Sequence, residues 1–264
     1  MAQAPRRNSG HKRRRGRENR RRERDRKIYA ILRRMVLIAE HNHRVHGVPV
    51  APLSVFYGKE GAPDEWELTP FPIGMQENER PMPQWEDLSQ WMKVMVATML
   101  GHQWELLTFN IHLHAELEAE LDDPTAVRAR LAERVRKHLR RAIGPGREWF
   151  FVIEGTSTRG NVPTFLHLHG AIAAYDRSEV PRVEDALARA AGHDVGGRGR
   201  KPRSVHTAWF QTIQVAYVDY LFKFAKQFDP RLDDRRLVMS QPMTAAARDL
   251  WIDITRPKLR ACSP

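Results

Sequence analysis

Two histidines, His167 and His169, are the residues whose type and spacing most suggest chemistry. They flank Leu168 in the apolar run 164–173 (TFLHLHGAIA), which predicts a buried strand. Side chains alternate across a strand, so the two imidazoles share one face while Leu168 points to the other. In a core, each imidazole would need a hydrogen-bond partner, whereas a divalent metal accepts both as ligands. The pair therefore predicts a metal site.

A carboxylate completes the candidate ligand set. Glu154 ends a second predicted strand, 148–154, and the loop 155–163 would join it to the histidine strand as a hairpin. That pairing would bring the carboxylate beside both imidazoles. Two imidazoles and a carboxylate with open positions suit Mg²⁺ or Mn²⁺, particularly where a substrate phosphate supplies further oxygens.

Two other groups of histidines compete for this role. His112 and His114 repeat the His-apolar-His spacing, but they run into an acidic stretch, and we interpret them as a strand end and a loop. The group at 41–46 (HNHRVH) lies in a polar stretch flanked by Gly and Pro, and it is more typical of a helix end and loop than of metal ligands.

A third group of reactive types lies on a predicted helix at 215–228. Tyr217 and Tyr220 are three residues apart, as are Tyr220 and Lys223, so each pair shares a helix face. A nearby ammonium favours the deprotonated form of a phenol, which would make Tyr220 a nucleophile. The helix taken alone, however, favours an amphipathic core helix with half-buried tyrosines.

Hydrophobic periodicity gives the elements that must position these residues. Strands are predicted at 104–111, 148–154, 165–175 and 204–210, and helices at 28–40, 85–100, 124–142, 183–191, 215–228 and 244–252. From residue 104 to residue 228 the order is β-α-β-β-α-β-α. Two strands in direct succession indicate an antiparallel pair. We therefore expect an α+β fold in which an antiparallel sheet carries helices on one side.

Charge is concentrated at the N-terminus. Residues 1–27 contain 13 basic and 3 acidic residues, so they account for most of the net charge of +12. Such a segment buries too little apolar surface to fold alone, and we expect a disordered basic tail. Arginine binds phosphate bidentately, which favours contact with nucleic acid over a merely solubilising role. The candidate phosphate contacts are Arg13, Arg14, Arg15, Arg20, Arg21 and Arg22.

Composition also limits the compartment and the kind of site. The single cysteine, Cys262, allows neither a disulfide within one chain nor a cysteine-ligated zinc finger. The N-terminus lacks the apolar core of a signal peptide, and no apolar run reaches the ~18 residues of a membrane span. We expect a soluble, cytoplasmic protein that has no membrane partner.

Taken in order, these motifs resemble those of the HUH endonucleases, and within that superfamily the rolling-circle replication initiators (Rep proteins) of phages and plasmids. Residues 106–110 (LLTFN) are similar to the first strand motif of the family. Residues 152–154 (VIE) and 165–172 (FLHLHGAI) resemble its acidic ligand and metal motif, and 220–223 (YLFK) its Tyr-x-x-Lys motif. The resemblance covers about residues 104 to 228.

The resemblance implies an antiparallel sheet with helices on one side, related to the RNA-recognition-motif fold. It implies a DNA nickase in which His167, His169 and Glu154 hold Mg²⁺ or Mn²⁺, Tyr220 attacks the scissile phosphate to leave a 5′-phosphotyrosine, and Lys223 assists. The partners would be single-stranded DNA at a replication origin, a host helicase and a polymerase. No P-loop motif is present, so strand opening would depend on that helicase.

The resemblance also orders the chain and leaves alternatives. Four segments are expected: a basic tail (1–27), a helical and irregular extension (28–100), an endonuclease domain (101–230) and a C-terminal cap or tail (231–264). Many phage initiators space two tyrosines four apart, whereas here the spacing is three, so we expect one nucleophile, Tyr220, with Tyr217 as a second or substitute. A non-catalytic DNA-binding protein on the same fold and an HUH transposase of a mobile element remain alternatives.

Overall fold

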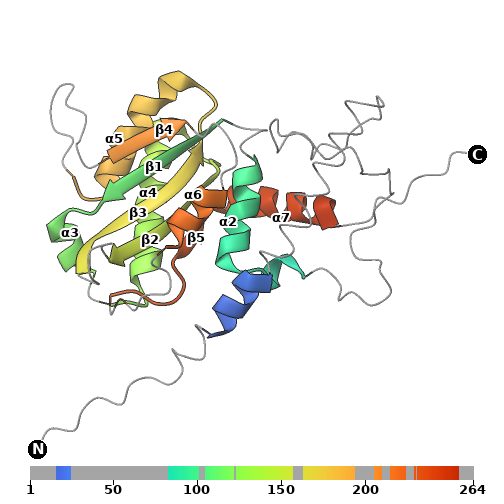
Figure 1. The fold of residues 1–264 in the computed structure, drawn as a ribbon. Coiled ribbons are helices and arrows are strands. Elements are labelled where there is room, and N and C mark those ends of the chain that lie inside the picture. Colours follow the sequence, from blue (N-terminus) through green and yellow to red (C-terminus); the bar gives the residue numbers. More distant parts are fainter. Residues whose placement is uncertain are drawn as a thin grey trace, which may run out of the picture.

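One antiparallel sheet is the centre of the fold. The computed structural model describes residues 16–24, 83–100, 105–121, 123–156, 163–193, 205–209, 215–223, 229 and 231–255. The strands are β1 (Leu106–His112), β2 (Trp149–Thr156), β3 (Pro163–Ala173), β4 (Val205–Trp209) and β5 (Leu237–Met239). Their order across the sheet is β4-β1-β3-β2-β5, and every neighbouring pair is antiparallel (Figure 1). The predicted α+β class and antiparallel sheet are confirmed.

The helices connect and cover these strands. They are α2 (Gln90–Met99), α3 (Ala115–Ala119), α4 (Val127–Ile143), α5 (Val180–Ala190), α6 (Val215–Leu221) and α7 (Gln241–Thr255), with 3₁₀ turns at Trp85–Asp87 and Arg177–Glu179. Strands β1 to β4 alternate with α4 and α5 in the order β-α-β-β-α-β, as the sequence predicts. In the part of the chain that the structure describes, no helix is both long enough and apolar enough to cross a membrane.

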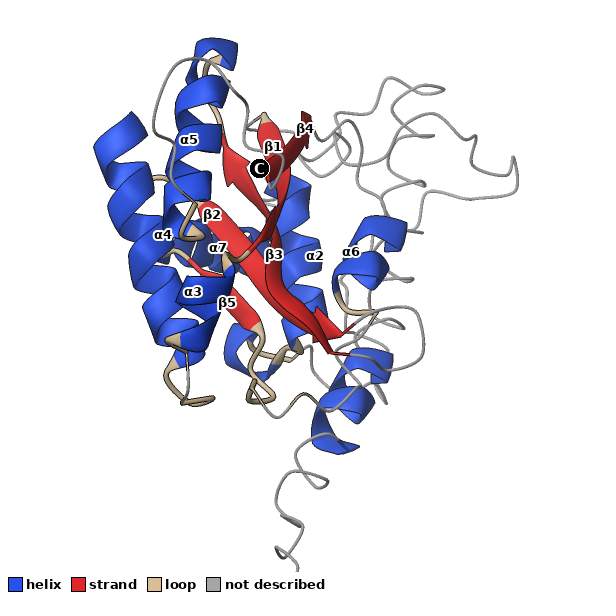
Figure 2. Ribbon diagram, turned by 90° about the vertical axis from the view of Figure 1, so that its left-hand side faces the viewer, coloured by secondary structure: helices blue, strands red, loops and turns tan. Residues whose placement is uncertain are grey.

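Helices cover both faces of the sheet, so the prediction of helices on one side is wrong. Helices α4 and α5 pack on one face, and α2 and α6 pack on the other (Figure 2). Helix α7 shares the buried core of α2 and α6. The cause is visible in β2, where Phe151 and Ile153 face the first layer while Phe150 and Val152 face the second. All four side chains are buried, and a strand that is apolar on both faces must be covered on both.

Helix α4 illustrates how sequence spacing sets the first layer. Its buried residues recur every four positions and form one stripe against the sheet: Val127, Leu131, Val135, Leu139 and Ile143. The remaining positions are largely basic. The helix ends at Gly144, whose φ of 91° lies in the left-handed region that glycine adopts readily. The chain then turns directly into β2.

Part of the basic tail is ordered against the second layer. Residues 16–24 form a helix, which corrects the prediction of a disordered tail for this stretch (Figure 1, blue). Glu18 Oε1 accepts a hydrogen bond from the backbone N–H of Gln90 at 2.9 Å, at the start of α2. A carboxylate is favourable there because the N–H groups of the first helical turn lack partners within the helix. The predicted helix 28–40 and the remaining tail residues lie outside the described residues.

The C-terminal stretch completes the sheet and the second layer. Strand β5 pairs with β2 through Val238 opposite Phe151. Helix α7 then packs on the same face as α2, where Trp251 is buried and donates from Nε1 to the carbonyl of Pro83 at 3.0 Å. The predicted helix 244–252 falls within α7, and residues 256–264 lie outside the described residues. Residues 237–255 are thus integral to the second layer.

Gly170 is the position where the packing of the sheet leaves no room for a side chain. A Cβ atom there would lie 2.1 Å from the carbonyl oxygen of Phe150 and 2.7 Å from Cζ of Phe109. We expect Gly170→Ala to lower the free energy of unfolding by about 3 kcal/mol, because the backbone of β2 cannot yield as a flexible side chain would. Chemical denaturation measures this change.

Gly16→Ala is the matched control, because a Cβ atom at Gly16 meets nothing within 4 Å. Its effect should stay within about 0.5 kcal/mol. Equal stabilities for the two variants would contradict the close approach of β2 and β3.

Candidate functional site

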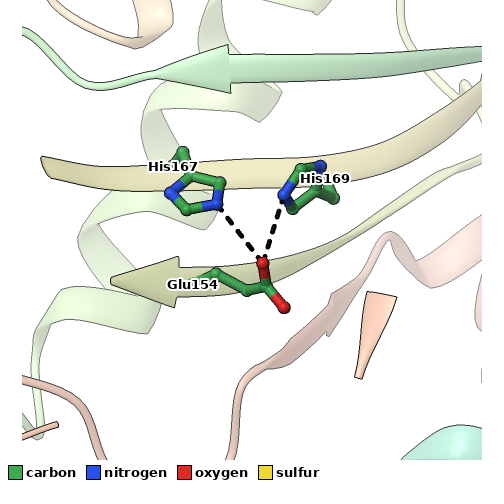
Figure 3. A group of neighbouring side chains, drawn as sticks. All are labelled: Glu154, His167 and His169. Carbon is green, nitrogen blue, oxygen red and sulfur yellow. Dashed lines mark ion pairs between the residues drawn. The ribbon is translucent and has the colours of Figure 1, made fainter. Parts of the chain in front are cut away.

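The pairing of β2 with β3 brings the candidate metal ligands together. Glu154 on β2 lies directly opposite His167 on β3, and His169 is two residues further along β3. Alternation along β3 puts both imidazoles on the face covered by α2, α6 and α7, while Leu166 and Leu168 enter the opposite core. Figure 3 shows the two rings directed at the carboxylate. The hairpin predicted from sequence is therefore present.

The three side chains form a compact, buried group. Nε2 of His167 lies 3.3 Å from Oε2 of Glu154, and Nε2 of His169 lies 3.2 Å from the same oxygen. One ligand atom from each residue lies within 4.8 Å of the others. Glu154 is 1% exposed, His167 8% and His169 3%. The group could hold a metal ion.

The hydrogen-bonding state of the three residues fits a cation. Nδ1 of His167 lies 3.2 Å from the carbonyl oxygen of Phe165, which can only accept, so Nδ1 donates there and Nε2 is the nitrogen directed at Glu154. Both oxygens of Glu154 and Nε2 of His169 are buried without a hydrogen-bond partner among the described residues. Buried polar atoms are normally satisfied. Buried nitrogen and oxygen atoms that converge in this way are the arrangement of a candidate ligand set.

The titration behaviour of these residues also suits ligation. Burial alone would raise the pKa of Glu154, but the two imidazoles and Lys223 outweigh it, and the pKa is lowered from 4.5 to about 2. Burial lowers the pKa of His169, although Glu154 opposes this shift. The group therefore contains an ionised carboxylate and a neutral imidazole at neutral pH, which are the forms that bind a metal.

Tyr220 and Lys223 lie beside this group. The Tyr220 ring packs edge-on against His169, with centroids 5.1 Å apart, and the residue is 44% exposed. Nζ of Lys223 lies 3.4 Å from the centroid of the Tyr220 ring and 3.8 Å from Oε2 of Glu154. One ammonium thus contacts both the candidate nucleophile and the candidate ligand. Helix α6 ends at Leu221, and the residues after Lys223 up to 228 lie outside the described residues.

Tyr217 has a different environment from Tyr220. Its hydroxyl donates to the carbonyl oxygen of Gly170 at 3.0 Å, and its ring packs against the second core. Burial, with a smaller contribution from Tyr220, raises the pKa of the Tyr217 phenol. A phenol that is harder to ionise and already hydrogen-bonded to β3 is suited to anchor the helix rather than to react.

The second histidine pair separates into two roles. His112 is the last residue of β1, and its ring packs against that of His167 with centroids 5.0 Å apart. His114 caps α3, where Nδ1 accepts from the backbone N–H of Glu116, so a helix rather than a loop begins there.

Sequence reasoning missed Asn110, which pairs with His169 and has a buried Oδ1 without a hydrogen-bond partner among the described residues. Period-two spacing from His112 would have put it on the same face.

The candidate phosphate contacts differ among themselves. Arg20 and Arg21 are exposed on the helix 16–24. The side chain of Arg22 is only 13% exposed and donates to Oδ1 of Asp219 at 3.1 Å. Its guanidinium is engaged within the protein instead of facing solvent. Arg13, Arg14 and Arg15 lie outside the described residues, as do the histidines at 41–46.

Comparison with known proteins adds no family assignment. No protein-family model matches the chain, and neither a search of curated proteins nor one of solved structures finds a match. The functional argument therefore depends on the geometry of the site.

The lowered pKa of Glu154 has a consequence for stability. A carboxylate with a depressed folded-state pKa adds stability above its unfolded value of 4.5, and this contribution is lost as the pH falls from there toward about 2. In metal-free protein, the free energy of unfolding of wild type should fall more steeply than that of Glu154→Gln over this range. Denaturant titrations in EDTA at several pH values between about 6 and 3 measure it; parallel curves would contradict the shift.

The ligand set is tested by direct metal titration. Wild type should bind one Mn²⁺ per chain, and Glu154→Gln, His167→Gln and His169→Gln should each weaken the Kd about tenfold or more. His112→Gln is the matched control, because its ring contacts His167 but does not belong to the group of three. Isothermal titration calorimetry measures the four variants. Equal loss in His112→Gln would redefine the ligand set, and unchanged binding in all four would remove it.

Proposed function

We propose that the protein is a metal-dependent single-strand DNA endonuclease of the HUH type that initiates rolling-circle replication through a 5′-phosphotyrosine intermediate. One observation carries the proposal: Tyr220 lies beside His169, in the metal-competent group, and shares Lys223 with Glu154. The consecutive strands β2 and β3 contribute the candidate ligands, and α6 with the turn that follows it contributes Tyr220 and Lys223. Metal, nucleophile and cation are the parts that phosphoryl transfer to tyrosine requires.

The topology supports the same class. The order β1-α4-β2-β3-α5-β4, with strands arranged 4-1-3-2, is the order expected of a split β-α-β fold such as the RNA-recognition motif, and it supports the proposal. In this arrangement both crossover helices, α4 and α5, lie on one face. The opposite face carries the ligand set, and there α6 supplies the tyrosine. Beyond this order, β5 extends the sheet beside β2, and α2 and α7 pack in the second layer.

The chemistry can be written for this chain's residues. The Tyr220 oxygen attacks phosphorus, a Tyr–O–P bond forms, and the P–O3′ bond breaks, so the phenolic proton is replaced by phosphorus and the departing oxygen takes up a proton as a 3′-OH. Glu154, His167 and His169 would hold Mg²⁺ or Mn²⁺, which supplies Lewis-acid polarisation of the phosphate. Lys223 neutralises charge on the phosphate and orients it. The new 3′-OH primes a polymerase, and the phosphotyrosine link allows later resealing without ATP.

The partners follow from this reaction. The substrate is single-stranded DNA at an origin, and the exposed arginines at 20 and 21 supply sequence-independent phosphate contacts next to the second layer. A host helicase would open the duplex and a host polymerase would extend the 3′ end, which puts the reaction in the cytoplasm.

Covalent attachment to DNA tests the proposal. Labelled circular and randomised single-stranded DNA, including DNA from the protein's own replicon, is incubated with Mn²⁺ or with EDTA and resolved on a denaturing gel. Wild type should form an adduct only with the metal. Tyr220→Phe should lose it, because the attacking oxygen is absent. Tyr217→Phe, the matched control, should still form the adduct, because the Tyr220 oxygen is present and the ring at position 217 keeps its place in the second core. Loss of the hydrogen bond to Gly170 should only slow the reaction.

The outcomes separate the alternatives. An adduct that survives in Tyr220→Phe but disappears in Tyr217→Phe would keep the reaction and reverse the assignment of the nucleophile. The absence of any adduct on DNA from its own replicon would favour a non-catalytic DNA-binding protein. Preferred cleavage at the ends of a mobile element would indicate a transposase.

A further inference from the structure

We infer that Arg22, acting through Asp219, is a positioning residue for Tyr220, and that the N-terminal helix 16–24 is thereby part of the active site. The inference rests on the proposed function, since it concerns the orientation of the proposed nucleophile. It assigns a role to an arginine that composition alone would assign to phosphate binding. The Asp219 carboxylate receives hydrogen bonds from two other parts of the chain.

Asp219 is held from two directions. Arg22 donates from NH2 to Oδ1 at 3.1 Å, and the buried Trp91 of α2 donates from Nε1 to the same oxygen at 3.0 Å. Charge-assisted hydrogen bonds of this kind are stronger than neutral ones. The two donors lie 197 and 128 residues away in sequence, so the contact joins three separate segments.

Arg22 also contacts the far end of the same helix. Its NH1 atom donates to the carbonyl oxygen of Phe222 at 3.4 Å, and its guanidinium lies 5.8 Å from the centre of the Phe222 ring. Carbonyl groups at a helix C-terminus lack partners within the helix, and a cation there is favourable. Asp219 and Phe222 flank Tyr220 on either side in sequence. The Arg22 guanidinium therefore bonds to residues on both sides of the proposed nucleophile, Tyr220.

Helix α6 needs such external support. It has seven residues, Val215–Leu221, which is far below the length at which an isolated helix is stable in water. Its orientation is set by contacts: Val218 and Leu221 in the second core, Tyr217 on Gly170, and Asp219 toward Arg22 and Trp91. Asp219 directly precedes Tyr220, so a rotation of α6 that released Asp219 would also move the phenol from His169.

The contacts of the N-terminal helix place Arg22 against Asp219. Glu18 and Arg22 are four residues apart and share the docked face, where Glu18 accepts from Gln90 and Arg22 donates to Asp219. Arg17, Arg20, Arg21 and Arg24 are exposed. The same helix thus orients α6 with one face and presents arginines to solvent with the other. DNA bound to the open face would act on an element that is fixed to the nucleophile helix.

The test separates chemistry from DNA binding. Arg22→Ala, Arg22→Lys and Arg20→Ala are compared in the full-length chain, with the single-turnover rate of adduct formation and the Kd for single-stranded DNA measured separately in Mn²⁺. Arg20→Ala removes the same charge from the exposed face. We expect Arg22→Ala to slow adduct formation about tenfold or more with a Kd no weaker than that of Arg20→Ala. Arg22→Lys should recover part of the rate.

Arg20→Ala should weaken the Kd, which gives the effect of losing one exposed charge on DNA affinity for comparison with Arg22→Ala. Hydrogen exchange without DNA gives an independent readout: amides of 217–223 should exchange faster in Arg22→Ala than in Arg20→Ala. Equal rates and equal exchange in the two alanine variants would overturn the inference and leave the proposed function intact. A wild type that forms no adduct would instead remove the proposed function, and the positioning role with it.

Discussion

The register between β2 and β3 is the constraint on which the rest of the site depends. With Glu154 opposite His167, the carboxylate and both imidazoles meet on one face. A slip of one residue would turn Glu154 into the opposite apolar core. Beyond Glu154 the register shifts, and the chain is held there by Arg231, which donates to the carbonyl oxygen of Gly155 and pairs with Asp229. A Cβ atom at Gly155 would collide with both side chains, so glycine is needed for Arg231 and Asp229 to pack against the strand.

A buried carboxylate between two imidazoles is costly to maintain, and the structure indicates what offsets the cost. An ionised Glu154 that is 1% exposed needs positive charge or hydrogen-bond donors. Its oxygens have no hydrogen-bond partner among the described residues, and the nearest ammonium, Lys223, is 3.8 Å away. A divalent cation would compensate the carboxylate and use the lone pairs of both imidazoles.

The candidate site residues and the order of the first four strands could be predicted from the sequence, whereas the second helical layer could not. His167, His169, Glu154, Tyr220 and Lys223 could be found because strand alternation and helical spacing are local rules. The second helical layer was missed because buried strands such as β2 read as apolar runs that do not reveal how many faces are covered. The ordered helix 16–24 was missed for another reason. Its composition predicts disorder, whereas its order comes from Gln90 and Asp219, contacts that no local pattern contains.

The two tyrosines show how topology assigns roles that spacing leaves open. Two nucleophiles that alternate must both reach the phosphate, but Tyr217 donates its hydroxyl to Gly170, the residue after His169. Tyr220, one helical turn further on, then lies edge-on to His169 and outside the core. With a spacing of three, the first tyrosine bonds to β3 while the second lies beside the candidate ligands. Exchange of the two roles would require α6 to leave β3, which Asp219 and its two donors oppose.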